Sequence, residues 1–192
     1  YFADDFYLMP KTIESNKAEI LNWCKDNNIT AIVPTRDGEL LFWANWKSEL
    51  LSNGIKVMVP NARSVEACLD KLLFSSSCRK LNLPAINSDL KIENCEFNFF
   101  VVKERYGAGS QSIAINVDIE SALKHSETLE NPLFQPFVPG SEISVDSYIT
   151  ESGIVKGIVT RFRSVVDKGE SVITETFFNE TLNNQLLEII KK

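Results

Sequence analysis

A lysine and a loop of small residues stand close together in the stretch FVVKERYGAGSQSIAI, and both could bind phosphate. Lys103 ends an apolar run that begins at Phe100, and a second apolar stretch begins at Ile113, so the pattern predicts strand, loop and strand. Backbone N–H groups of such a loop can surround an anion, and the lysine adds a compact positive charge. The alternative is a hairpin turn in which the glycines only supply positive φ angles. The loop residues in question are Gly107, Ala108, Gly109 and Ser110.

Three better-known phosphate loops do not fit this stretch. The dinucleotide fingerprint G-x-G-x-x-G needs a third glycine where Ser112 stands, and it needs a helix where this chain has a strand pattern. The G-x-x-x-x-G-K-[ST] loop is absent from the sequence. In protein kinases the glycine loop precedes the lysine, whereas here Lys103 comes first. The interpretation that remains is a strand–loop–strand hairpin with Lys103 at its base.

The composition is that of an ordinary soluble globular protein. The 192 residues are 44% apolar and 24% charged, and a net charge of −6 argues against nucleic acid or an anionic membrane as the partner. No apolar run approaches the roughly 20 residues of a membrane span, and we expect a cytoplasmic protein. The four cysteines have neither a CxxC pair nor zinc-site spacing, so we expect small buried side chains rather than disulfides. A hydrolytic triad would need the single histidine, His125, which we interpret as a surface residue.

The first part of the chain has the pattern of a parallel α/β fold. Apolar spacing and capping residues predict helices over 15–28 and 37–54. Each is followed by a short apolar strand, over 29–35 and 55–60. Helix, strand, helix, strand is the order of a parallel sheet with helical crossovers. A single longer helix is predicted over 64–82.

The second part changes to strands rich in Val, Ile and Phe, which predicts a mainly antiparallel α+β structure. One helix over 118–127 interrupts the strands, and another over 181–192 closes the chain. The predicted strands are 97–105, 112–117, 132–138, 142–149, 153–166 and 171–177.

The segment FVVKERYGAGSQSIAI, followed by NPLFQPFVPGSEISVDSYI, resembles the ATP-grasp superfamily. In particular it is similar to the branch that contains the carbamoyl-phosphate synthase large chain and D-alanine–D-alanine ligase. The resemblance covers nearly the whole chain and depends on the order of a strand with a lysine, a glycine loop, a hinge strand and a G-x-E. It implies an ATP site. The matching residues are Lys103, Tyr106, Gly107, Ala108, Gly109, Ser110, Gln135, Pro136, Phe137, Val138 and Glu142, with Lys71 of the segment LDK as a second lysine.

The resemblance implies a role for each part of this site. Backbone groups of the hinge would pair with the adenine N6 amine and N1, and Phe137 and Val138 would offer apolar surface to the base. Gln135 stands where the family often has an acid, and its amide oxygen can still accept from the amine. Glu142 would accept from both ribose hydroxyls. The alternatives are core packing for Phe137, a solvated strand acid for Glu142 and a surface helix lysine for Lys71.

Arg161 and Arg163 lie two residues apart on a predicted strand, so they should point to one face. A guanidinium group binds phosphate and carboxylate bidentately, which makes the pair candidate catalytic residues. The alternative is a solvated basic face.

The family holds magnesium with acids and an asparagine in an E-x-N pattern, and no such pattern follows Arg163. The sequence therefore offers no metal ligands, and we expect a fragment truncated at both ends. The resemblance divides it into the end of a pre-ATP-grasp domain over 1–62, an N-lobe over 63–131 and a partial C-lobe over 132–192.

The resemblance predicts the ATP-binding portion of a carboxylate-amine or carboxylate-thiol ligase that acts through an acyl phosphate. Its ligands would be ATP, Mg²⁺ in the full-length protein and a small carboxylate, with a homodimer as a possible assembly. The alternative is a nucleotide-binding module without turnover, with a sensory or structural role. Whether this chain is itself an enzyme stays open at this point.

Overall fold

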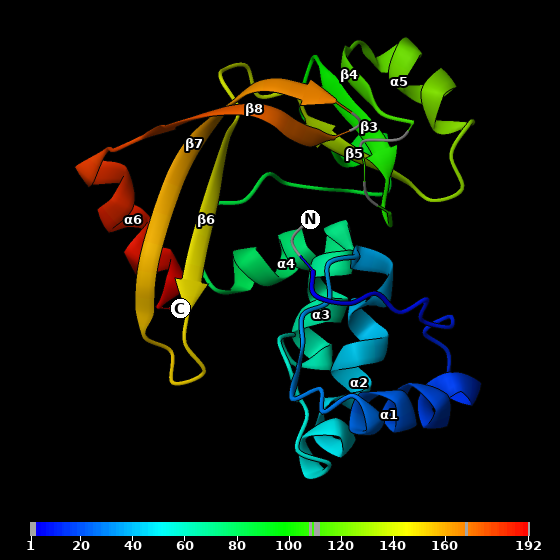
Figure 1. Ribbon diagram of the computed structural model, residues 1–192. Coiled ribbons are helices and arrows are strands. Elements are labelled where there is room, and N and C mark those ends of the chain that lie inside the picture. Colours follow the sequence, from blue (N-terminus) through cyan, green and yellow to red (C-terminus); the bar gives the residue numbers. More distant parts are fainter. Residues whose placement is uncertain (1–2, 108, 110–111, 168, 192) are drawn as a thin grey trace. The chain divides into compact units, whose positions relative to one another are not determined.

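The computed structural model describes residues 3–107, 109, 112–167 and 169–191 (Figure 1). The chain forms two compact units, Tyr1–Leu69 and Asp70–Lys192. The first unit is α/β with a parallel strand pair, and the second has two antiparallel sheets. This is the fold class that the sequence predicts.

The first unit follows the predicted order of helix, strand, helix and strand. Its helices and strands are α1 (Lys17–Asp26), β1 (Ala31–Ile32), α2 (Leu40–Ser52), β2 (Lys56–Val57) and α3 (Ala62–Leu69), with short 3-10 helices at Glu14–Asn16 and Asp37–Glu39. Strands β1 and β2 pair in parallel, as expected, but each is only two residues long. Gly54 ends the α2 segment with a φ of 79°, a conformation that glycine adopts without strain.

The core of the first unit is built around one face of α2. Trp43, Trp46 and Leu50 are spaced by three and four residues, so they share a helix face, and all three are buried. The two tryptophan rings stack with centroids 5.9 Å apart. Ile20 and Cys24 of α1 complete the contact.

The long helix predicted over 64–82 is wrong, because the helix breaks at Asp70. Helix α3 ends at Leu69, and α4 (Lys71–Lys80) begins immediately after. Asp70 adopts an extended backbone with φ −100° and ψ 104°, and its carboxylate caps the first turn of α4. The apolar spacing continues across this residue, which is why periodicity alone does not reveal the break.

The first sheet of the second unit contains β3 (Phe100–Glu104), β4 (Ala114–Val117) and β5 (Pro132–Pro136) in the order β4-β3-β5, all antiparallel. Helix α5 (Ile119–Ser126) covers one face (Figure 1). Ala122 of α5 packs there against Phe100, Val102 and Phe134, with Ile92 of the 3-10 helix Ile92–Asn94 beside them.

The register between β3 and β5 decides which residues face away from α5. Phe100 pairs with Pro136 and Val102 pairs with Phe134 on the core face. Because neighbouring residues of a strand alternate between faces, the opposite face carries the other pairs. Those are Val101 with Gln135 and Lys103 with Leu133. The predicted phosphate lysine and the predicted hinge glutamine therefore share one face of the sheet.

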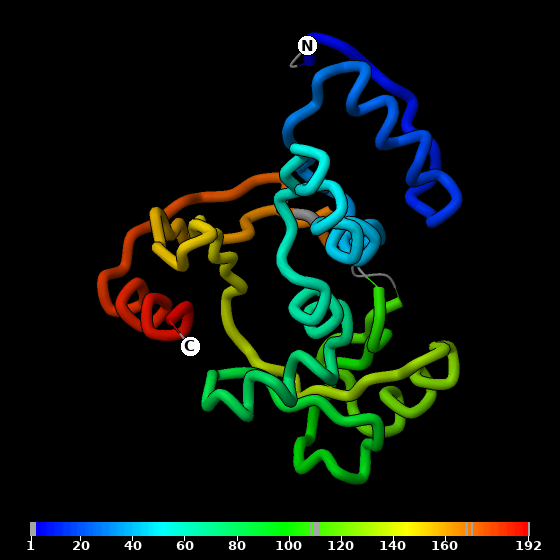
Figure 2. The backbone as a smooth tube through the Cα atoms, turned by 90° about the horizontal axis from the view of Figure 1, so that it is seen from below, coloured from blue at the N-terminus to red at the C-terminus, as the bar shows by residue number. Residues whose placement is uncertain are grey.

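The second sheet consists of β6 (Ile143–Ile149), β7 (Val155–Asp167) and β8 (Glu170–Phe177), again antiparallel. Helix α6 (Glu180–Ile190) follows β8, and the chain ends directly after it (Figures 1 and 2). The strand-rich second part of the chain is thus confirmed.

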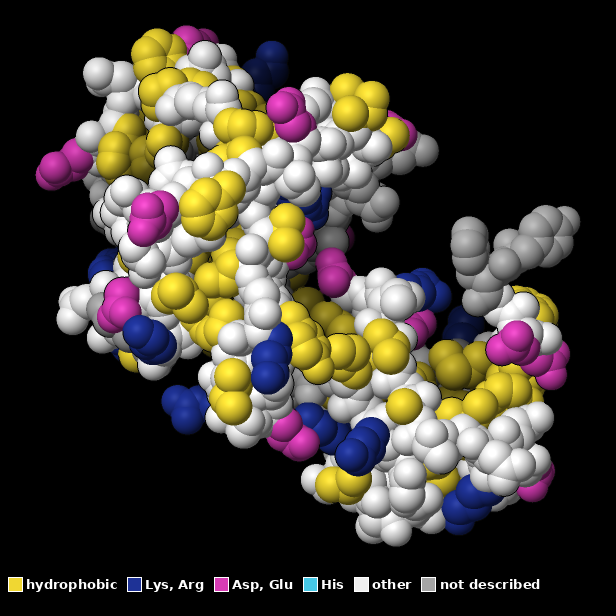
Figure 3. Space-filling model, turned by 60° about the vertical axis from the view of Figure 1, so that its left-hand side comes forward, with side chains coloured by type: hydrophobic (Ala, Val, Ile, Leu, Met, Phe, Trp, Pro, Cys, Tyr) yellow, Lys and Arg dark blue, Asp and Glu magenta, His cyan; other side chains and the backbone are white. Residues whose placement is uncertain are grey.

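The surface mixes side chains of every kind. On the face shown in Figure 3, basic and acidic side chains lie scattered among hydrophobic ones rather than gathered by sign. No helix in the described ranges is both long enough and apolar enough to cross a membrane. All four cysteines are free, as expected, but only Cys24 and Cys78 are buried; Cys68 is exposed and Cys95 is half-buried, so the expectation of four buried thiols is wrong.

The alternation of β3 gives a stability test. Phe100 is 1% exposed in the core under α5, whereas its neighbour Phe99 is 53% exposed. Phe100→Ala should lower the free energy of unfolding by about 3–5 kcal/mol, because it leaves a cavity, and Phe99→Ala by about 1 kcal/mol or less. Urea unfolding of both variants measures the difference, and equal losses would contradict the assigned register.

Candidate functional site

Lys103 presents a positive charge that forms no direct ion pair among the described residues. It lies on β3, one residue before the strand ends, and its side chain is partly buried. No hydrogen-bond acceptor or carboxylate among the described residues pairs with its ammonium group. The pKa of Lys103 is lowered, chiefly by burial and also by the nearby ammonium of Lys71, while Glu142 acts in the opposite direction. The structure therefore brings together three of the predicted ligand-binding residues.

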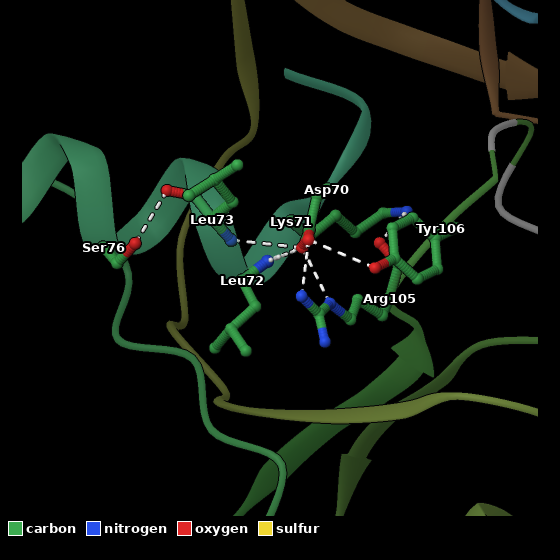
Figure 4. Close-up of polar contacts among 7 residues, drawn as sticks. All are labelled: Asp70, Lys71, Leu72, Leu73, Ser76, Arg105 and Tyr106. Atoms are coloured by element: carbon green, nitrogen blue, oxygen red, sulfur yellow. Dashed lines mark hydrogen bonds and ion pairs between the residues drawn. The ribbon is translucent and has the colours of Figure 1, made fainter. Parts of the chain in front are cut away.

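The start of α4 is tied to the segment after Lys103 by a carboxylate (Figure 4). Asp70 Oδ1 accepts from the backbone N–H groups of Leu72 and Leu73 at 3.0 and 3.1 Å. Arg105 donates through Nε to Oδ1 at 2.8 Å and through Nη2 to Oδ2 at 2.5 Å. Tyr106 adds a hydrogen bond from its hydroxyl to Oδ2 at 3.2 Å. The Arg105 guanidinium is the main cause that lowers the pKa of Asp70 to about 2.

Lys71, the first residue of α4, holds the backbone of the same segment. Its ammonium donates to the carbonyl oxygens of Gly107 at 2.8 Å and Arg105 at 3.3 Å, and its backbone N–H donates to Arg105 O at 3.2 Å. Burial lowers the pKa of Lys71, and the acids Glu104 and Asp70 oppose that shift. Lys71 is therefore neither a free surface lysine nor a fully available phosphate ligand.

Two glycines of the loop have positive φ angles, which fits both a phosphate loop and the alternative of a simple hairpin turn. Gly107 and Gly109 have φ angles of 100° and 77°, which other residues rarely adopt. A Cβ on Gly107 would meet no heavy atom within 4 Å, so the φ angle rather than crowding requires glycine there. Tyr106 is 46% exposed, and its ring lies 5.1 Å from the Arg105 guanidinium. Ala108 and Ser110 lie outside the described residues.

The predicted hinge has one backbone acceptor and one backbone donor on the edge of β5 that faces away from β3, next to the residue where Asp89 pairs with Phe134. Backbone bonds from Arg105 N to Asn131 O and from Phe137 N to Phe99 O fix the alternation between β3 and β5. It follows that the C=O of Pro136 and the N–H of Val138 point away from β3. Phe137 is half-buried and outside the core, and Val138 is exposed. An adenine hinge would use these two backbone groups, and the assignment of Gln135–Val138 as a hinge stays a prediction.

Gln135 has a partner that sequence reasoning missed. Its side-chain amide donates from Nε2 to Ser88 Oγ at 2.7 Å, and Ser88 is 6% exposed. The backbone of the neighbouring Asp89 bonds twice to Phe134, which places this segment along β5. No local sequence signal marks Ser88, because it meets Gln135 only through the tertiary fold.

The two candidate catalytic arginines share one face of the second sheet, as predicted, and both are paired with acids. Arg161 donates through Nε to Asp146 at 2.6 Å. Arg163 forms a short ion pair with Glu142, the predicted ribose ligand. The carboxylates belong to β6 and its approach, and the guanidinium groups belong to β7. The alternative, a solvated basic face, is therefore an incomplete description, because each arginine forms an ion pair with an acid on or just before β6.

The low pKa of Asp70 makes a stability prediction. A carboxylate whose folded pKa is about 2, below its unfolded value near 4, adds stability above pH 4 and loses it as the pH falls from about 4 to 2. Asp70→Asn keeps a capping oxygen but loses the ion pair, so it should cost about 1–2 kcal/mol at pH 7 after allowance for solvent screening. The gap from the unmodified protein should close near pH 2 in unfolding experiments.

Asp118 provides the matched control for this prediction. It caps α5 through Ser121 N at 2.9 Å, but no arginine pairs with it in the described part of the chain. Asp118→Asn should therefore have the smaller effect. Equal effects at the two caps would mean that the Arg105 pair contributes nothing.

Comparison with known proteins matches both units of the chain. Residues 1–58 match the family described as PylC-like, N-terminal domain, and residues 68–176 match the ATP-grasp domain family. A carbamoyl-phosphate synthase from Methanobrevibacter smithii is 26% identical over 176 residues, which cover 82% of this chain and 46% of that protein. The chain thus spans about half the length of this curated relative.

Solved structures share the fold at low identity. The biotin carboxylase domain of 2-oxoglutarate carboxylase from Hydrogenobacter thermophilus, a dimer in complex with MgADP, ADP and bicarbonate, has a TM-score of 0.70 at 14% identity and covers 92% of this chain and 44% of its own. D-alanine–D-alanine ligase from Bacillus anthracis has a TM-score of 0.62 at 19% identity and covers 92% and 64%. With the ATP-grasp match extending over more than half of its residues, this chain belongs to the ATP-grasp domain family.

Proposed function

We propose that this chain is the ATP-binding part of a ligase that joins a carboxylate to an amine or a thiol. The observation that carries the proposal is the Lys103 ammonium, which is partly buried near Lys71 and forms no direct ion pair or hydrogen bond among the described residues. Two ammonium groups held close together repel each other, and burial adds to the cost. A bound polyphosphate would supply the missing negative charge.

The surrounding groups fit the remaining parts of ATP. The Pro136 carbonyl can accept from the adenine N6 amine, and the Val138 N–H can donate to N1. Glu142 attracts Lys103 electrostatically, which places the two side chains near each other. A ribose bound by Glu142 would therefore lie between a base at the hinge and phosphates at Lys103. The backbone N–H groups near Gly107 would then face the phosphate chain.

The reaction that we propose for the whole protein proceeds in two steps. A carboxylate oxygen attacks the γ-phosphorus of ATP, and the bond from that phosphorus to ADP breaks. The amine or thiol then attacks the acyl carbon of the acyl phosphate, and inorganic phosphate leaves. The part of this chain is to bind and orient ATP, which is the main source of catalysis in phosphoryl transfer. Arg161 and Arg163 are candidates for binding the carboxylate or the transferred phosphoryl group.

The related structure with MgADP and bicarbonate supports a magnesium nucleotide and a small carboxylate-like substrate as ligands. Within the described ranges no three His, Cys, Asp or Glu side chains gather into a metal-binding group. We therefore assign no magnesium ligand and derive no step through the metal.

The first experiment is titration calorimetry of the chain with ATP, ADP, AMP and adenosine. Affinity should rise with the number of phosphates, because Lys103 would meet the phosphate chain and the charge of Lys71 lies near it. No detectable binding of ATP at millimolar concentration would contradict the proposal. Binding of all four ligands with one affinity would remove the lysine site from it.

Lys103→Ala tests the phosphate contact directly. It should weaken ATP binding by about 1.5–3 kcal/mol, the range for a hydrogen bond to a charged group, and should change adenosine binding little. Lys124→Ala is the control, because Lys124 is an exposed lysine of α5. Equal losses for ATP and adenosine in calorimetry would place Lys103 elsewhere than at the phosphates.

Glu142→Ala tests the ribose contact in a cycle with 2′,3′-dideoxy-ATP, which lacks both hydroxyls. The variant should lose about 1–3 kcal/mol of ATP binding but little binding of the dideoxy analogue. Because the variant also removes the acid that pairs with Arg163, which keeps its hydrogen bond to Gly169 O, Asp146→Ala serves as the control that removes the acid paired with Arg161. If Glu142→Ala weakened the binding of ATP and of dideoxy-ATP equally, Glu142 would not contact the ribose. The same would follow if Asp146→Ala changed the ratio of the two affinities as much as Glu142→Ala does.

A further inference from the structure

The buried residue Ser88 lies against the predicted adenine hinge. Asp89 N donates to Phe134 O at 3.0 Å and Phe134 N donates to Asp89 O at 2.9 Å, so this segment adds itself to the outer edge of β5. The next residue of β5 is Gln135, whose Nε2 donates to Ser88 Oγ at 2.7 Å. Gln135 is therefore held at its amide end by a residue that is only 6% exposed.

The direction of this hydrogen bond follows from the groups behind Ser88. Its hydroxyl faces the carbonyl oxygen of Ile86 at 3.5 Å, and Ser75 of α4 donates to the same carbonyl at 2.9 Å. Gln135 Nε2 is the donor to Ser88 Oγ, and the Ile86 carbonyl, which can only accept, is a long-range partner for the Ser88 proton, so a lone pair of Ser88 is directed to Gln135. Only the NH₂ end of the Gln135 amide can use that lone pair.

The other end of the amide is left as an acceptor. In the described part of the chain no donor forms a hydrogen bond to Gln135 Oε1. Gln135 lies on the face of the first sheet that carries Lys103, and it directly precedes the hinge carbonyl of Pro136. An acceptor at this place suits the exocyclic amine of adenine and repels the 6-oxo group of a hypoxanthine or guanine base.

We propose that Ser88 is a positioning residue that favours adenine over 6-oxopurines, because it turns the Gln135 carbonyl oxygen toward the base. The inference depends on the proposed function, in which the hinge binds the base of a nucleotide. The hinge backbone also discriminates between the two bases, so Ser88 supplies one part of the selectivity.

The test compares the dissociation constants of ATP and ITP, which differ only at C6 and N1 of the base, by titration calorimetry. The unmodified chain should prefer ATP. Ser88→Ala should reduce the ATP-to-ITP preference about fivefold, the value of roughly one hydrogen bond, since the amide is then free to flip. Ser88→Cys, which fills the same space but accepts weakly, should act in the same direction, and Ser88→Thr should keep the preference.

A second background separates orientation from packing. In Gln135→Glu both side-chain oxygens accept, so the preference for ATP should persist without help from Ser88. Adding Ser88→Ala to Gln135→Glu should then leave the ratio unchanged. Ser76→Ala is the control for loss of a hydroxyl, because Ser76 bonds only within α4, to Leu73 O at 2.9 Å.

Each outcome decides between the proposals. If the unmodified chain binds ATP and Ser88→Ala and Ser88→Cys leave the ratio unchanged, the role of Ser88 is wrong while the proposed function stands. The role of Ser88 is also wrong if Ser88→Ala changes the ATP-to-ITP ratio equally in the unmodified chain and in the Gln135→Glu background, because the Gln135 amide would then not be involved. If neither ATP nor ITP binds to the unmodified chain, the proposed function fails and this inference fails with it.

Discussion

The carboxylate of Asp70 is the interaction on which the arrangement of the candidate site depends. It caps α4, pairs with Arg105 and accepts from Tyr106, so the start of one helix is fixed to the residues that follow β3. Because α4 begins at Lys71, the same contact places the Lys71 ammonium beside the loop and close to Lys103. Two like charges would otherwise separate. The Asp70–Arg105 ion pair next to them holds the start of α4 in place, and the proposed anion site depends on that contact.

The first sheet provides the second constraint, because one of its faces packs in the core and the other carries the predicted ligand-binding residues. Residues of one parity, such as Phe100 and Val102, pack under α5 and stabilise the unit. Residues of the other parity include Lys103 and Gln135, which stay on the face away from α5. A shift of the register by one residue would bury the lysine in the core and expose the phenylalanine. The packing of the core therefore also fixes the chemistry of the opposite face.

The sequence predicts much of this from local patterns, and its failures share one physical cause. Periodicity predicts the order of helices and strands, the strand–loop–strand pattern singles out Lys103 and the glycine loop, and the resemblance to the ATP-grasp superfamily adds the hinge. The break at Asp70 escapes because apolar spacing continues through it, while its partner Arg105 lies 35 residues away. Ser88 and Gln135 are separated by 47 residues. Contacts of that separation are set by the tertiary fold, so no pattern within one segment can reveal them. The exposed Cys68 is a similar case, since burial depends on neighbours distant in sequence.

The ion pairs of the second unit differ in how easily a ligand could open them. The Asp70 and Arg105 side chains are 12% and 26% exposed and share a bidentate contact, so opening it would leave poorly hydrated charges. Glu142 is 70% exposed in its pair with Arg163, and an exposed pair contributes about 0–1 kcal/mol. Two ribose hydroxyls on the same carboxylate would contribute more, about 1–3 kcal/mol. Under the proposed function, a nucleotide would displace Arg163 from Glu142, and Arg163, whose side chain is only 17% exposed, would keep its hydrogen bond to Gly169 O.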